Sequence, residues 1–160
     1  MWVADLGSGS YCRADVCVDI NFEWSNPYHI PQQYDKIVAP KSKICDKVLA
    51  DLNYPLPFRD NAFSKVYLVR VLEHLLCPYH TLLEVKRIMK DGGELIVIVP
   101  NAVKNLADWR DEEHIYSFTE KTIERLVSKV FKIEELRLIM HDEDIYIKAR
   151  KIENKPYNKI

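Results

Sequence analysis

The stretch that decides the fold is VADLGSGSYCRADVCVDIN, which runs from Val3 to Asn21. Two apolar runs, 1–6 and 16–20, are too short for helices and predict buried strands. A loop with two glycines joins them, and only six residues separate Gly9 from Val16. Six extended residues reach about 20 Å, enough to return to a parallel neighbour, whereas a helical crossover needs about a dozen residues. The stretch therefore predicts two parallel strands joined by a loop without a helix.

Strands and helices alternate along the rest of the sequence. Apolar runs predict strands at 47–50, 64–69 and 94–99. The spacing of apolar residues predicts two helices, at 78–89 and at 120–129 behind a capping Thr119. Glycines at 92 and 93 should end the first helix, whose expected inner stripe is Leu82, Leu83, Val85 and Ile88.

The end of the chain completes the expected fold class. Segments 131–139 and 144–151 alternate between apolar and polar residues, as an antiparallel pair does. The expected architecture is α/β: a doubly wound, Rossmann-like, mostly parallel sheet with a C-terminal antiparallel hairpin and a truncated first crossover helix. We expect a single domain, 1–160, because the chain is too short for two ordinary domains.

Composition excludes several classes of protein. Lys and Arg number 23 against 24 Asp and Glu, so no overall charge favours nucleic acid or an acidic membrane as a partner. The longest apolar run is far too short to span a bilayer, and we expect no signal peptide. The four cysteines form no C-x-x-C pair and have no histidine at zinc spacing. We therefore expect reduced thiols, no metal site and a cytoplasmic protein, with no disulfide among Cys12, Cys17, Cys45 and Cys77.

The glycine loop indicates a cofactor. A nicotinamide fingerprint, G-x-G-x-x-G, would need a third glycine where Cys12 stands and a helix after it. A nicotinamide oxidoreductase is therefore disfavoured. Asp5 instead lies inside the first strand, two residues before Gly7.

In this respect VADLGSGS resembles the first motif of class I S-adenosylmethionine-dependent methyltransferases. CVDIN resembles their second motif, and the segments further along resemble the subgroup known as methyltransferase type 11 in the expected order. Those segments are LADLNYPLPFRDNAFSKVYLVRVLEHL, LLEVKRIMKDGGELIVIVPN, EEHIYSFTEKTIERLV and DIYIKARK. Three positions depart from the family pattern: Ser10 replaces a glycine, Lys65 an acid and Asp91 a proline.

The resemblance implies S-adenosyl-L-methionine as the cofactor and assigns its ligands. Asp5 would steady the loop around the methionine part, Asp19 would accept both ribose hydroxyls, and Asp51 would accept from the adenine amino group. Without a helix N-terminus, the cofactor carboxylate would bind loop N–H groups of residues 8–11 with Arg13 or Arg70. The expected cofactor-binding residues are Asp5, Gly7, Ser8, Gly9, Ser10, Asp19, Ile20, Asp51, Leu52 and Arg70.

Catalytic candidates follow the fourth and fifth strands. His74 and Glu73 come after the fourth strand, and His114 comes after the fifth. For each of them, the alternative to a catalytic role is a purely structural one. The sequence VRVLEHL stands where enzymes that methylate base or glutamine amino groups carry N-P-P-Y. An oxygen, carbon or aliphatic amine acceptor on a small molecule, glycan or protein remains open.

One sheet face lacks a predicted cover, and parallel sheets are normally covered on both faces. Either the aromatic segment 22–34 folds over it or a second subunit does, so a homodimer stays open. Four aromatic residues could instead frame an acceptor: Trp24, Tyr28, His29 and Trp109. No N-terminal helices precede the first motif, so we expect a compact form. The truncated start keeps a second function open, a catalytically inactive S-adenosylmethionine-binding module with a regulatory or interaction role.

Overall fold

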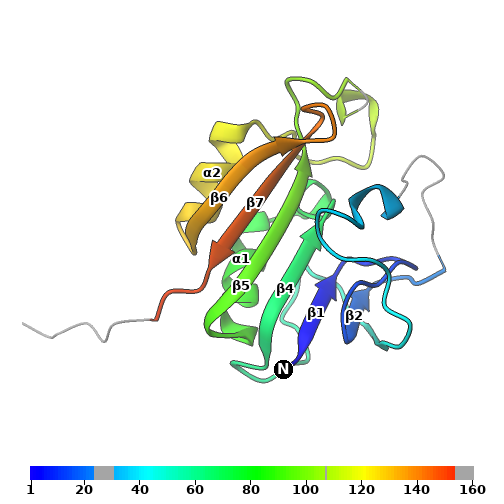
Figure 1. The fold of residues 1–160 in the computed structure, drawn as a ribbon, viewed down its shortest axis with the longest axis vertical. Helices are drawn as coiled ribbons and strands as arrows, with labels where there is room; N and C mark the ends of the chain where they lie inside the picture. The colour runs from blue at the N-terminus through cyan, green and yellow to red at the C-terminus, as the bar shows by residue number, and fades with distance from the viewer. Residues whose placement is uncertain (24–30, 107, 154–160) are drawn as a thin grey trace, which may run out of the picture.

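A seven-stranded sheet runs through the molecule in the order β3-β2-β1-β4-β5-β7-β6 (Figure 1). The computed structural model describes residues 1–23, 31–106 and 108–153. All neighbouring strands are parallel except where β7 lies antiparallel between β5 and β6. The elements are β1 (Val3–Leu6), β2 (Val16–Asp19), η1 (Pro31–Tyr34), β3 (Asp46–Leu49), β4 (Phe63–Val69), η2 (Leu72–His74), α1 (Pro78–Ile88), β5 (Met89–Pro100), η3 (Asp108–Arg110), α2 (Glu120–Ser128), β6 (Lys132–Ile139) and β7 (Asp144–Arg150).

The predicted fold class is confirmed, including the loop that replaces the first crossover helix. Strands β1 and β2 pair in parallel with Ala4 opposite Val16, and no helix lies between them. One boundary differs from the expectation. Helix α1 ends at Ile88, before the glycines, and β5 starts at once, so residues 89–93 form an irregular start of that strand.

The two α-helices lie on one side of the sheet (Figure 1). Their buried residues form one apolar cluster with alternate residues of the strands, such as Leu82 and Ile123 with Leu68. The expected inner stripe of α1 is wrong at Leu83, which is 42% exposed, whereas Leu82, Val85 and Ile88 are buried as expected. Thr119 caps α2 as predicted, through a reciprocal capping box with Thr122. Within the described ranges, no helix is long and apolar enough to cross a membrane.

The opposite face of the sheet is covered by chain without an α-helix and by charged side chains. Tyr34, at the end of η1, is fully buried, and residues 37–39 pack with it against the sheet. Further along this face, the ammonium nitrogens of Lys65 and Lys148 form ion pairs with the carboxylate oxygens of Glu94, at 2.6 and 3.1 Å. The face is thus covered within one chain, partly by the predicted segment, and a homodimer stays a prediction. Of the aromatic candidates, Trp24, Tyr28 and His29 lie outside the described residues.

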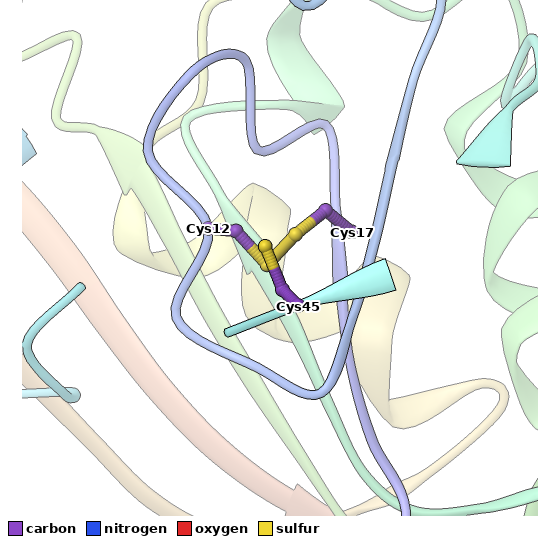
Figure 2. A group of neighbouring side chains, drawn as sticks. All are labelled: Cys12, Cys17 and Cys45. Carbon is purple, nitrogen blue, oxygen red and sulfur yellow. A yellow bond between two sulfur atoms is a disulfide. The ribbon is translucent and has the colours of Figure 1, made fainter. Parts of the chain in front are cut away.

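The expectation of four reduced thiols is wrong. A disulfide joins Cys12, in the β1–β2 connection, to Cys17 in β2, and Cys45 and Cys77 are free. The tight parallel return brings the Cα atoms of the bonded pair to 5.6 Å, inside the usual range for a disulfide. Sequence spacing alone did not reveal this proximity. Figure 2 shows Cys45 beside the disulfide, and the three sulfur atoms lie within 4.8 Å of one another.

Candidate functional site

A cavity of about 560 Å³ opens at the carboxyl ends of the strands. Ligands of open α/β sheets bind at this edge. The cavity is lined by all ten residues expected to bind the cofactor, from the glycine loop to Arg70. Two catalytic candidates, His74 and His114, also line it, whereas Glu73 lies buried behind its wall.

The glycine loop turns sharply at the tip of β1. Gly7 has a φ of +75°, and a Cβ there would lie 2.4 Å from a methyl group of Val71. The backbone can therefore follow this path only without a side chain. The N–H groups of Gly7, Ser8 and Tyr11 donate to carbonyls of this region, whereas no described residue accepts from the N–H of Ser10. A ligand anion in the cavity could accept from that remaining donor.

Asp5 holds the far end of the loop in place. Its carboxylate is 1% exposed and accepts from the backbone N–H of Arg13 at 2.8 Å. The Arg13 guanidinium lies 4.0 Å from the same oxygen. Burial raises the pKa of Asp5 to about 6, and the charge of Arg13 offsets only part of that rise. A cationic ligand group in the cavity would find a carboxylate already deprived of water.

Asp19 joins the tips of β1 and β2. One of its oxygens accepts from the N–H of Gly9 at 2.7 Å, and the other accepts from the N–H of Asn21 at 3.0 Å. A carboxylate offers about four lone-pair sites, so two remain for a ligand. Because the backbone fixes the carboxylate, two vicinal hydroxyls could bind it without any side-chain rearrangement.

Asp51 and Leu52 follow β3 at the same edge. Oδ1 of Asp51 accepts from both the backbone and the side-chain nitrogen of Asn53, each at 2.9 Å. Asn53 also lines the cavity, and it fixes the main chain here by accepting from the N–H of Leu76. Asn53 was not a candidate from the sequence, because no local pattern singles it out.

Arg70 sits at the tip of β4 with a positive φ of 59°, unusual for a residue other than glycine. Its guanidinium donates to Asp144 at 2.6 Å, and the hydroxyl of Tyr34 donates to the other oxygen of that carboxylate at 2.7 Å. Burial raises the pKa of Asp144, although Arg70 opposes the rise. The pair fixes the orientation of Arg70 toward the cavity wall. Neither Tyr34 nor Asp144 was a candidate from the sequence.

The three catalytic candidates come together. The rings of His74 and His114 pack edge to face, with 4.6 Å between their centroids, and Glu73 precedes His74 in η2. Burial raises the pKa of Glu73 to about 8, and nearby Arg70 opposes that rise. Burial, followed by the neighbouring His114, lowers the pKa of His74. Trp109, an aromatic candidate, is 67% exposed and donates its indole N–H to the carbonyl of Ala102.

Comparisons with known proteins match this geometry. A family model described as "Methyltransferase domain" matches residues 7–97. The chain belongs to this family. The match covers the glycine loop, Asp19, Asp51, β4 and most of β5, and the resemblance to class I methyltransferases is confirmed.

Relatives and solved structures extend the likeness. The chain is 34% identical over 97 residues to the uncharacterized protein MJ0638 of Methanocaldococcus jannaschii; the match spans 61% of this chain and 38% of that protein's length. One solved structure is a complex of the Haloferax volcanii Trm112 methyltransferase activator with a methyltransferase. A chain of that complex aligns with a TM-score of 0.71 at 15% identity, and the alignment covers 94% of this chain and 82% of that chain. An S-adenosylmethionine-dependent methyltransferase from Aquifex aeolicus aligns with a TM-score of 0.68 at 15% identity, and the alignment covers 94% of this chain and 81% of that enzyme's chain. At these identities, the structures support the fold.

Proposed function

We propose that the protein binds S-adenosyl-L-methionine in this cavity and transfers its methyl group to an acceptor. One observation carries the proposal: the glycine loop and three strand-end carboxylates, Asp5, Asp19 and Asp51, face one cavity in a chain of the methyltransferase-domain family. The cavity of about 560 Å³ falls within the range of about 300–1,000 Å³ typical of sites for ligands of this size.

The lining residues fit the three parts of the cofactor. Asp5 suits an amino group, and the N–H of Ser10, which donates to no residue that the structure describes, suits a carboxylate, so together they suit the amino-acid end. Asp19 suits the ribose diol with its two unused lone-pair sites. Asp51 and the backbone N–H of Leu52 suit the edge of adenine, while Ile20 and Leu52 supply apolar contact.

The chemistry needs little from the protein beyond placement. Bound S-adenosyl-L-methionine would supply a methyl group on a sulfonium sulfur: the acceptor would bond to the methyl carbon in line as the carbon–sulfur bond breaks, and S-adenosylhomocysteine would leave with the bonding electron pair. The chain's residues hold the acceptor in position and exclude water, a source of large rate enhancement. His74 and His114 lie at the cavity wall, where an imidazole nitrogen can take a proton from the acceptor. An oxygen, carbon or aliphatic amine of a small molecule, glycan or protein remains the acceptor class.

Calorimetric titration tests the proposal. S-adenosylhomocysteine and S-adenosylmethionine should bind one molecule per chain, and NADH should not. Release of S-adenosylhomocysteine in the presence of cell extract would then report turnover. Failure of S-adenosylhomocysteine to bind at millimolar concentration would overturn the proposal. Binding without turnover on any extract would favour a catalytically inactive binding module instead.

A further inference from the structure

A cluster of two histidines and one glutamate lies beside the cofactor cavity. Glu73 and His74 belong to η2, and His114 belongs to the loop between β5 and α2. One potential ligand atom from each residue lies within 4.8 Å of those of the other two. The loop is tied to η2 by the N–H groups of Ile115 and Tyr116, which both donate to the carbonyl of Glu73. The cluster therefore has a fixed backbone frame.

Hydrogen bonds orient both imidazole rings. Nδ1 of His114 is 2.7 Å from the carboxylate of Asp108, and Nδ1 of His74 is 3.2 Å from the carbonyl of Glu113. A carboxylate and a carbonyl only accept, so each Nδ1 must carry the hydrogen. In the neutral rings, each Nε2 then holds a lone pair. A histidine that gives its other N–H to a carboxylate or carbonyl is the usual arrangement of metal-bound histidines.

Glu73 lacks the partners that a buried carboxylate normally has. Its side chain is fully buried, and neither oxygen has a hydrogen-bond partner among the described residues. The nearest cation, Nε of Arg70, is 3.7 Å away, and that guanidinium already donates to Asp144. Leaving a buried carboxyl group without hydrogen bonds is costly, so an unpartnered one indicates a missing ligand.

We propose that Glu73, His74 and His114 bind one divalent transition-metal ion of the Zn²⁺ class. Two imidazoles and one carboxylate form a known catalytic zinc set that leaves a position open. Zinc binds such donor atoms at about 2.0–2.2 Å, so ligand atoms that now lie within 4.8 Å of one another would move closer together around the ion. Asp111, whose carboxylate is 3.4 Å from Nε2 of His114 and which lines the cavity, stands close enough to join as a further ligand.

The ion's place fits a role in acceptor activation, an inference that rests on the proposed methyl transfer. It would replace the proton-accepting role of His74 and His114, because the Nε2 lone pairs that could take a proton would bind the ion. An acceptor hydroxyl bound at the open position would lose its proton to water more readily, as metal-bound water does. The resulting oxygen anion attacks the methyl carbon as the carbon–sulfur bond breaks, and the bonding electron pair stays on sulfur. This chemistry selects an oxygen acceptor from the classes left open above.

Metal binding can be measured without any methyl acceptor. Protein treated with EDTA and dialysed is titrated with Co²⁺, whose visible absorption reports nitrogen and oxygen coordination, and with Zn²⁺ by calorimetry. We expect one ion per chain, with Glu73→Gln and His114→Gln each weakening binding at least tenfold. His80→Ala, at an exposed histidine on α1, is the matched control and should bind as the unchanged protein does.

Two outcomes would overturn the inference. One is the absence of Co²⁺ and Zn²⁺ binding at micromolar concentration. The other is equal binding by the unchanged protein and both site variants. A lowered melting temperature of Glu73→Gln without metal binding would identify the cluster as a structural clasp for the loop and count against the proposal. S-adenosylhomocysteine titrated into the EDTA-treated protein separates the two proposals, because its binding needs the glycine loop and not the metal.

Discussion

Replacing Asp19 by asparagine should weaken S-adenosylhomocysteine binding without unfolding the protein. The carboxylate already accepts from the N–H groups of Gly9 and Asn21 through different oxygens. An asparagine amide keeps only one acceptor oxygen and places a donor where the other stood. The oxygen that remains can still accept from the N–H of Gly9 and from one ribose hydroxyl, but the NH2 group that replaces the other oxygen can accept neither from the N–H of Asn21 nor from the second hydroxyl.

The size of the loss follows from one charge-assisted hydrogen bond. Such a bond contributes about 1.5–3 kcal/mol. Since about 1.4 kcal/mol corresponds to a factor of ten, we expect the Kd to rise about 10- to 150-fold. The cost to folding should be smaller, because Asp19 is only half-buried and water can reach the groups it leaves.

Asp15 provides the matched control for this titration. Its carboxylate also accepts from a backbone N–H, that of Val3 at 2.9 Å, but it lies at the amino end of β2, away from the cavity. Asp15→Asn should therefore leave the calorimetric Kd within about twofold of the unchanged protein. An Asp19→Asn Kd equally unchanged, or an equal loss in both variants, would refute the assignment of the ribose site.

Three further predictions concern the loop that carries the cofactor site. Removing the disulfide with Cys12→Ser/Cys17→Ser should lower the free energy of unfolding in urea by about 2 kcal/mol, because the unfolded chain regains the entropy that a cross-link closing so short a loop removes. Cys77→Ser, at an exposed free thiol, should not change it, and equal effects would contradict the prediction. The raised pKa of Asp5, about 6 against 3.8, means that the folded state binds this proton more tightly than the unfolded state. Stability relative to Asp5→Asn should therefore rise as the pH falls from 7 to 4, by up to roughly 3 kcal/mol; a difference independent of pH in chemical denaturation would exclude the shift. Gly7→Ala should lower the melting temperature, because alanine at this positive φ costs about 1–2 kcal/mol and its Cβ meets Val71. Adding Val71→Ala should restore part of the loss, and strictly additive effects would rule out the contact.

The fold could be predicted from sequence because its signals are local. Short apolar runs identified the strands, and the count of residues between Gly9 and Val16 excluded a helix whatever the rest of the chain did. The prediction that Leu83 lies on the inner side of α1 was wrong for a reason that is not local. An apolar stripe allows more than one facing residue, and only packing against the sheet determines which one is buried.

The cofactor side of the site was predictable for the same reason. Asp19 and Asp51 each follow or end an apolar run, Asp5 lies one residue before the end of such a run, and parallel strands bring their carboxyl ends to one edge. The disulfide was not predictable from spacing rules. It depends on the exact distance at which the loop returns, which the cysteine pattern does not contain.

The sequence by itself determined the order of strands and helices, the glycine loop and the carboxylates around it, because each depends on residues close together in the chain. The tertiary structure alone decided which groups meet from far apart. It set Arg70 against Asp144 and buried Tyr34 over the second face, and it placed Glu73 beside two oriented histidines with no hydrogen-bond partner among the described residues. These contacts depend on β7 entering the sheet between β5 and β6 and on the loop after β5 folding back over η2. Such long-range packing is fixed by the whole chain and by no single segment of it.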